Sequence, residues 1–147
     1  MIKGLKVIPL ERFEIDDGGF VGRVIRSSDS EFSGFGEAYI SAIPSGAVRA
    51  WKRHNEMRSN LTVVSGLVRF VLFDNRVGSD CAGEFFEITL GPGVKYARLA
   101  IPSGIWMGFQ GIHHDNSLIL NIANQVHDPG EIDTLDKSAI DFKWDFP

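Results

Sequence analysis

Lys52 and His54 are the two side chains whose types and spacing most directly indicate acid–base chemistry. They stand two residues apart in the segment Ala47–His54, which alternates like a β-strand, so both should project from one face. The small residues Val48 and Ala50 on that face indicate that it looks inward. An interior lysine beside an interior histidine is costly unless the space is wet or holds a ligand. The pair therefore predicts a site, and the alternative is a lysine on a solvent-facing strand.

Each member of this pair has a role in such chemistry. An unperturbed lysine has a pKa of about 10.4, and burial near other cations would lower that pKa toward the range of a general base. Alternatively, a protonated Lys52 stabilises an enolate oxygen while His54 takes the proton. The residues leave open which of the two is the base.

Basic, aromatic and amide side chains near this pair are candidates for substrate binding. Strand alternation places Arg49 and Trp51 on the face opposite the pair, and Arg58 follows the strand. Arginine suits phosphate oxygens, and a solvated charge at a strand edge is the alternative. Trp51 and Phe109 are candidates for stacking on a base or sugar, with core packing as the alternative. Asn121 is a candidate for a hydrogen bond to the sugar.

The sequence gives less evidence of a function for the remaining histidines and for the cysteine. His113 and His114 adjoin near an expected turn, and neighbouring side chains of a strand point to opposite faces, so a shared metal is not expected. His127 precedes an expected helix and is a candidate for the general acid, with a polar residue at a helix start as the alternative. Cys81 lies in an expected loop without a neighbouring histidine, so a catalytic thiol is not expected.

Ten short segments with strand character must position these residues, each bounded by turn residues such as Ser65-Gly66 or Pro102-Ser103-Gly104. The segments are Lys6–Phe13, Gly19–Ser27, Glu37–Ile43, Ala47–His54, Asn60–Val64, Leu67–Asp74, Glu84–Leu90, Tyr96–Ile101, Ile105–Ile112 and Ser117–Ala123. No helical stretch separates them, which excludes a parallel α/β sheet and favours an all-β barrel or sandwich. One short helix is expected over Pro129–Ala139, with Asp128 as its N-cap and Glu131 completing a capping box.

Length and charge restrict the class of protein. The chain has 147 residues, which predicts a single domain over 1–147. Its net charge of −4 argues against nucleic-acid or anionic-membrane partners. The single cysteine, a charged N-terminal stretch and the lack of a run of roughly 18 apolar residues predict a cytoplasmic protein that does not enter a membrane.

The order of the motifs resembles one branch of the cupin superfamily, the dTDP-4-dehydrorhamnose 3,5-epimerases. Val48-Arg49-Ala50-Trp51-Lys52 resembles that family's Leu-Arg-Gly-Leu-His strand, and residues 63–74 resemble its strand–turn–strand. Residues 100–109 resemble its Ile-Pro-x-Gly-x-x-His-Gly-Phe turn, and residues 118–129 its penultimate strand with an acidic exit. The tail 140–147 resembles its Ile-x-Trp-x-Asp-Pro end. Together these segments span most of residues 15–147.

The resemblance implies an all-β, cupin-type jelly-roll barrel that forms a homodimer and acts on a nucleoside-diphosphate 4-keto-6-deoxy sugar. In that family a base removes a proton next to the ketone, and an acid returns one to the other face, without a cofactor. Lys52 stands where the family has its base histidine, and Asn124-Gln125-Val126-His127 stand where it has its acid tyrosine. Met107 occupies the place of a metal-binding histidine in other cupins, and an ammonium beside the site opposes a dication, so no metal is expected.

The sequence therefore predicts a metal-free epimerase or keto-isomerase, and two alternatives stay open. One is a non-catalytic cupin that binds a sugar or another small molecule and has lost the acid and base residues. The other is a small metal-dependent cupin that uses His54 with His113 or His127.

Overall fold

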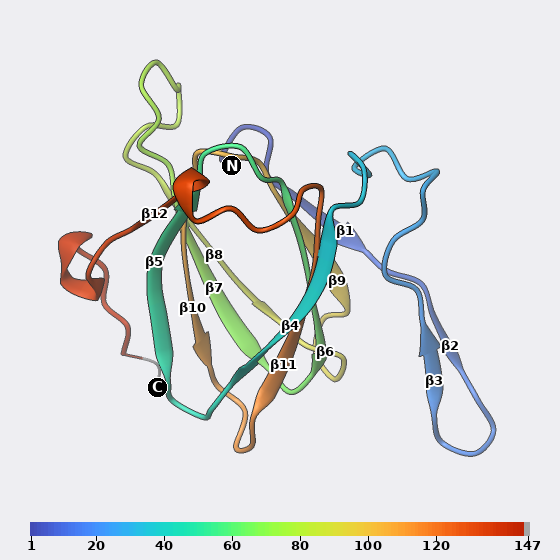
Figure 1. Ribbon diagram of the computed structural model, residues 1–147. Coiled ribbons are helices and arrows are strands. Elements are labelled where there is room, and N and C mark those ends of the chain that lie inside the picture. The colour runs from blue at the N-terminus through green and yellow to red at the C-terminus, as the bar shows by residue number, and fades with distance from the viewer. Residues whose placement is uncertain (146–147) are drawn as a thin grey trace.

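Two five-stranded antiparallel sheets face each other and form a barrel in the computed structural model, which describes residues 1–145 (Figure 1). The strands are β1 (Lys6–Pro9), β2 (Arg12–Glu14), β3 (Phe20–Gly22), β4 (Glu37–Ile43), β5 (Val48–His54), β6 (Ser59–Ser65), β7 (Val68–Phe73), β8 (Phe85–Leu90), β9 (Ala97–Ile101), β10 (Trp106–Gly111), β11 (Ser117–Ala123) and β12 (Ile132–Thr134). One sheet has the order β1-β9-β6-β11-β4 and the other β12-β5-β10-β7-β8. Phe146 and Pro147, the end of the tail motif, lie outside the described residues.

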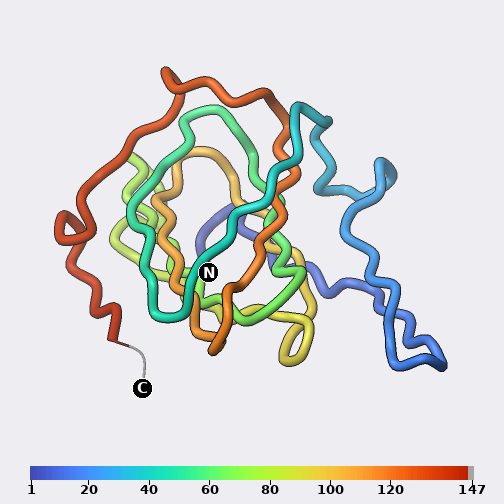
Figure 2. Tube along the Cα trace, turned by 60° about the horizontal axis from the view of Figure 1, so that its bottom comes forward, coloured from blue at the N-terminus to red at the C-terminus, as the bar shows by residue number. Residues whose placement is uncertain are grey.

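This architecture confirms the all-β, cupin-type jelly-roll fold. Two of the expected strands, β4 and β11, have the bounds that the sequence predicts. Gly19–Ser27 does not form one strand, since only Phe20–Gly22 is extended and paired. The resulting β2–β3 hairpin projects away from the barrel, as both views of the chain show (Figures 1 and 2).

The helix expected over Pro129–Ala139 is replaced by two 3-10 turns, Pro129–Glu131 and Lys137–Ala139, on either side of β12. Asp128 does cap the first turn, because its Oδ1 accepts a hydrogen bond of 2.9 Å from the Gly130 amide. The helix cannot continue because β12 pairs with β5 and is held extended. No helix in residues 1–145 has the length and apolar character that a membrane span requires.

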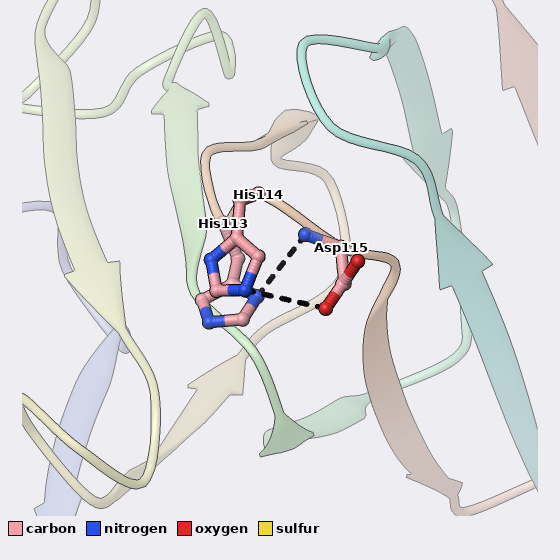
Figure 3. Close-up of side chains that lie close together, drawn as sticks. All are labelled: His113, His114 and Asp115. Atoms are coloured by element: carbon pink, nitrogen blue, oxygen red, sulfur yellow. Dashed lines mark hydrogen bonds and ion pairs between the residues drawn. The ribbon is translucent and has the colours of Figure 1, made fainter.

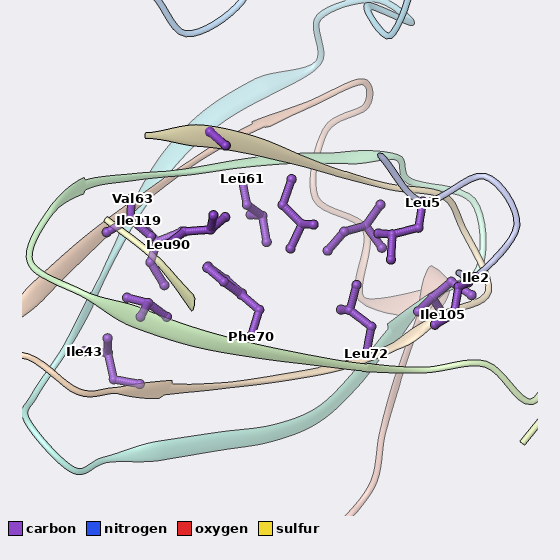
Figure 4. Close-up of a cluster of buried hydrophobic side chains, with 14 residues drawn as sticks. Ile2, Leu5, Ile43, Leu61, Val63, Phe70, Leu72, Leu90, Ile105 and Ile119 are labelled. Carbon is purple, nitrogen blue, oxygen red and sulfur yellow. The ribbon is translucent and has the colours of Figure 1, made fainter. Parts of the chain in front are cut away.

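The main core lies between the two sheets (Figure 4). Side chains of β7, among them Phe70 and Leu72, meet Leu61 and Val63 of β6 across this space, and all four are buried. Each fully buried side chain of this size contributes about 1.5–3 kcal/mol relative to an exposed one. This apolar layer holds the two sheets at a fixed separation, so their remaining inner surfaces can line a cavity.

The turn between β6 and β7 depends on Gly66. Its φ of 86° lies in the left-handed region, and a Cβ there would stand 2.3 Å from the Ser117 hydroxyl. Only glycine meets both conditions without strain. The Ser65-Gly66 turn predicted from the sequence is therefore present and sets the register of the two strands.

Candidate active site

A cavity of about 390 Å³ lies between the two sheets and contains the predicted acid–base pair. Strands β5, β10 and β12 supply one wall, and β4, β6 and β11 supply the other. The lining residues are Tyr39, Ser41, Val48, Arg49, Ala50, Trp51, Lys52, His54, Ser59, Leu61, Met107, Phe109, Ile119, Asn121, Thr134 and Leu135. This set contains two cationic side chains and no carboxylate, so the cavity favours an anionic ligand although the chain is acidic overall.

Lys52 and His54 both line the cavity, as strand alternation predicts. Lys52 stands opposite Met107 of β10 in the strand register, and Met107 packs against the main core, which identifies the inner face. No carboxylate of residues 1–145 lies within ion-pair distance of the Lys52 ammonium. A cation without a partner in the protein is available to a negatively charged ligand.

A β-bulge in β5 also brings Arg49 to the cavity. In the pairing of β5 with β10, Lys52 is opposite Met107, and Arg49 is opposite Phe109. Two residues of β5, Ala50 and Trp51, therefore face the single residue Gly108 of β10. The extra residue shifts the alternation by one position. The prediction that Arg49 lies on the opposite face from Lys52 is therefore wrong, because a regular strand was assumed.

His54 forms a buried dyad with Glu131 of the first 3-10 turn. Its Nδ1 is hydrogen-bonded to the Glu131 Oε1, and the two side chains are only 12% and 3% exposed. Glu131 Oε2 accepts two further hydrogen bonds, from the Glu56 amide at 3.0 Å and the Met57 amide at 3.1 Å. The carboxylate fixes the imidazole ring and leaves Nε2 as the nitrogen that can exchange a proton with a ligand.

Opposing influences act on the pKa of Glu131, and its net shift is downward. Burial is the largest single influence and raises the pKa, but the hydrogen bonds from His54, Glu56 and Met57 together outweigh it. Glu131 is therefore ionised at neutral pH. An ionised carboxylate at Nδ1 stabilises the imidazolium that forms when Nε2 accepts a proton.

Asn121, the predicted partner of the sugar, reaches the cavity from β11 and contacts Tyr39 of β4. Its Oδ1 accepts a hydrogen bond of 3.1 Å from the Asn60 amide, and its Nδ2 donates one of 2.8 Å to the Tyr39 hydroxyl. Both polar ends of the amide are thus engaged within the protein. Asn121 holds the tyrosine in place on the wall opposite β5.

The two aromatic candidates have different positions. Trp51 is only 2% exposed; its ring packs outside the barrel against Phe142 and Trp144, and its indole nitrogen donates to the Lys137 carbonyl at 3.2 Å. The ring therefore serves to hold the C-terminal segment against β5, along which that segment runs in Figure 2. Phe109 lines the cavity and also stacks against Phe70, with ring centroids 6.0 Å apart.

Two predicted site residues lie away from the cavity. Arg58 is exposed and borders a separate, smaller depression beside Asn60 and Lys6. His127 is exposed in the loop that follows β11 and is not among the lining residues. The structure therefore brings together Lys52, His54, Arg49, Phe109 and Asn121, and leaves these two outside.

The histidine pair of the β10–β11 turn forms a separate cluster (Figure 3). His113, His114 and Asp115 have their potential ligand atoms within 4.8 Å of one another, and they are the only such group of three within residues 1–145. A bend rather than a strand carries the two histidines, so their rings stack with centroids 4.0 Å apart instead of pointing to opposite faces. None of the three residues lines the cavity, so the donor set does not support a metal held jointly by His54 and His113.

Sequence reasoning missed Glu131 and Tyr39 as residues of this site. Glu131 was interpreted as part of a capping box, because its spacing after Asp128 fits that motif equally well. Tyr39 stands in a strand whose inner face is not evident from alternation, since Ala38 and Ile40 flank it. Both residues reach the site only through strand pairing with partners distant in the chain.

Comparison of sequences finds relatives of this chain, although no protein-family model matches it. The chain is 30% identical to the probable low-salt glycan biosynthesis epimerase Agl13 of Haloferax volcanii over 115 residues, which are 77% of this chain and 73% of that protein. It is 26% identical to the spore coat polysaccharide biosynthesis protein SpsL of Bacillus subtilis over 148 residues, covering 98% of this chain and 97% of SpsL.

Solved structures share the fold over nearly the whole chain. The crystal structure of a dTDP sugar isomerase from Desulfovibrio desulfuricans superposes with a TM-score of 0.92 at 32% identity, over 97% of this chain and 92% of that one. The dTDP-4-dehydrorhamnose 3,5-epimerase of Sulfolobus tokodaii shares the fold with a TM-score of 0.83 at 22% identity, over 95% of this chain and 81% of that one. On this similarity of sequence and structure, the chain belongs to the dTDP-4-dehydrorhamnose 3,5-epimerase-like branch of the cupin superfamily.

Proposed function

We propose that this protein is a sugar-nucleotide epimerase or keto-isomerase that removes a proton next to the ketone of a nucleoside-diphosphate 4-keto-6-deoxy sugar. The observation that carries the proposal is a His–Glu dyad beside an unpaired ammonium in a cavity whose lining contains no carboxylate. The names of the relatives, a glycan biosynthesis epimerase and a dTDP sugar isomerase, support the same class of substrate.

His54 is the base in this proposal. Glu131 binds Nδ1, so a neutral His54 carries its proton there and has a free electron pair on Nε2. The C–H bond next to the ketone breaks, its proton goes to Nε2, and the electron pair moves to the carbonyl oxygen to form an enolate. The Glu131 carboxylate compensates for the positive charge that the imidazole gains.

Lys52 stabilises that enolate. It lies two residues before His54 on the inner face of β5 and has no ion-pair partner in the described part of the chain. A cation near the developing negative charge lowers the barrier to enolate formation. The contact of the Glu131 carboxylate with the imidazole rather than the lysine supports this division of roles.

Arg49 is the side chain of the cavity best suited to the diphosphate. One of its guanidinium nitrogens donates to the Ala42 carbonyl at 2.7 Å, which holds the side chain over the β4–β5 end of the cavity. Its other N–H groups have no hydrogen-bond partner within residues 1–145 and can bind phosphate oxygens, which arginine does in a bidentate manner. Phe109 offers an apolar surface along the same wall.

Solvent deuterium exchange tests this proposal. With dTDP-4-keto-6-deoxyglucose in D₂O, the protein should incorporate deuterium next to the ketone, observed by proton NMR. His54→Asn and Lys52→Ala should each lower the exchange rate by about 100-fold or more. His114→Asn serves as the matched control, since this exposed histidine lies outside the cavity and should leave the rate unchanged. Binding of the nucleotide sugar without any exchange would contradict the proposal and favour a non-catalytic sugar-binding cupin.

Metal analysis of the same active preparation separates the metal-dependent alternative. We expect full exchange in protein treated with a chelator. A stoichiometric zinc, iron or manganese ion whose removal abolishes exchange would contradict the metal-free mechanism.

A further inference from the structure

Tyr39 presents a phenol to the cavity from the sheet opposite His54. It lies on β4, at the edge of the β1-β9-β6-β11-β4 sheet, whereas His54 lies on β5 in the other sheet. A ligand between the two walls would have the imidazole on one side and the phenol on the other. Tyr39 pairs in register with Asn121 of β11, and this pairing keeps both side chains on the inner face.

The hydrogen bonds around Tyr39 determine the direction in which its hydroxyl donates. The Asn60 amide donates to Asn121 Oδ1 at 3.1 Å, which identifies the other end of that side chain as the NH₂ group. Nδ2 of Asn121 then donates to the Tyr39 oxygen at 2.8 Å. The Tyr39 oxygen is therefore an acceptor in this contact, and no residue of the described chain accepts its proton. The O–H is left to donate to a ligand, and the same amide would stabilise the phenolate that remains.

We propose that Tyr39 is the proton donor that completes an inversion at the carbon next to the ketone, with Asn121 as its positioning residue. This inference rests on the proposed function, in which His54 forms the enolate. The Tyr39 O–H bond breaks and its proton forms a new C–H bond on the face opposite His54, while the enolate electrons return to carbon and restore the ketone. Tyr39 then regains a proton from water, and His54 releases its proton to water, so atoms and charges balance without a redox step.

The Tyr39→Phe variant tests this assignment by separating two rates. With dTDP-4-keto-6-deoxyglucose in D₂O, the wild type should show both deuterium exchange and inversion. Tyr39→Phe should retain exchange to within about 10-fold, since His54 is intact, and lose inversion by about 100-fold or more. Tyr96→Phe is the control, because that hydroxyl donates to the Arg23 carbonyl outside the cavity, and both of its rates should equal those of the wild type.

Three results would contradict the assignment. Inversion by Tyr39→Phe at the wild-type rate would remove the phenol from catalysis, and an equal loss of exchange and inversion would place Tyr39 in binding or proton abstraction instead. A wild-type product in which the ketone has moved and no carbon is inverted would contradict the role of Tyr39 as the proton donor of an inversion. Absence of exchange in the wild type is a distinct result, which would overturn the proposed function and this assignment with it.

Asn121→Asp tests the positioning role independently. A carboxylate still accepts the Asn60 amide proton but cannot donate to Tyr39, so the phenol would turn its proton toward Asp and away from the ligand. We expect exchange to persist while inversion falls by at least about 10-fold, with an unchanged circular dichroism spectrum. A variant that folds normally and keeps the wild-type ratio of inversion to exchange would contradict the positioning role.

Discussion

The most informative contacts at the scale of single residues are those of Glu131. This carboxylate comes from a 3-10 turn, is 4% exposed, and joins the His54 ring to the two backbone amides of Glu56 and Met57. A buried carboxylate is stable only when such partners satisfy it. The same contacts that satisfy Glu131 also orient the imidazole in the cavity, so structural stability and positioning depend on one side chain.

The Glu131→Gln variant tests this linkage. A glutamine side chain can still accept from the two amides, but it carries no charge to stabilise the imidazolium. We therefore expect deuterium exchange with dTDP-4-keto-6-deoxyglucose to fall by roughly 100-fold or more while the protein remains folded. Asp133→Asn is the control: Asp133 lies two residues later, pairs with Arg53 at 2.6 Å and does not line the cavity. Exchange by Glu131→Gln at the wild-type rate would exclude Glu131 from proton transfer.

At the scale of elements, the bulge of β5 and the C-terminal segment act together. The bulge directs Arg49 and Lys52 inward and Trp51 outward, where Phe142 and Trp144 cover it. Gly108 faces the bulge, and a Cβ there would stand 2.7 Å from the Trp144 ring and 2.8 Å from the Ala50 Cβ. The cationic wall of the cavity therefore depends on close packing outside the barrel.

The loop after β7 supplies a prediction about stability. Asp74 is fully buried and accepts hydrogen bonds from the Arg76 amide, the Arg76 guanidinium and the Ser79 hydroxyl. The hydrogen bond from the Arg76 guanidinium is the largest influence on its pKa, which falls from 3.8 to about 2. Because the pKa is lowered in the folded state, the stabilisation is fully present above pH 3.8 and disappears as the pH falls through about 2.

The Asp74→Asn variant should therefore show a pH-dependent loss. We expect it to lower the free energy of unfolding by about 1–3 kcal/mol at pH 7, measured by urea denaturation, and by much less near pH 2. Asp16→Asn, in the exposed turn between β2 and β3, is the control and should have no such effect. A loss for Asp74→Asn that is equal at both pH values would contradict the role of the ionised carboxylate.

At the scale of the whole molecule, the β2–β3 hairpin is an element that takes no part in the two sheets of the barrel. It extends away from both sheets (Figures 1 and 2), and Phe13, Ile15 and Val21 along it are 51%, 45% and 57% exposed. Apolar side chains gathered on a projecting hairpin mark an interaction surface. We propose that a second copy of the chain covers them, in agreement with the homodimer that the sequence predicts.

Light scattering after size-exclusion chromatography tests this proposal. The wild type should have the mass of a dimer, and the double substitution Phe13→Ser and Val21→Ser should shift it to the mass of a monomer, because each polar side chain weakens an apolar contact. Val77→Ser is the control, since Val77 is fully exposed in the β7–β8 loop and its substitution should leave the dimer intact. A wild-type monomer, or a dimer unaffected by the double substitution, would contradict the proposal.

Local patterns in the sequence were sufficient to predict much of the fold and part of the site. Alternation and turn residues predicted the strands of the barrel, including the bounds of β4 and β11, because strand period and turn chemistry depend on neighbouring residues. The same alternation placed Lys52 and His54 together on the inner face of β5. The order of the motifs was enough to identify the family.

Only the tertiary structure determined how the site is completed. The bulge that turns Arg49 inward, the pairing of β12 with β5 that joins Glu131 to His54, and the contact of Asn121 with Tyr39 each link residues that are distant in the chain or break the local period. The expected helix over Pro129–Ala139 failed for the same reason, because strand pairing with β5 outweighed the capping signal at Asp128. Contacts between distant segments decide which of several locally acceptable conformations is adopted, and no window of neighbouring residues contains that information.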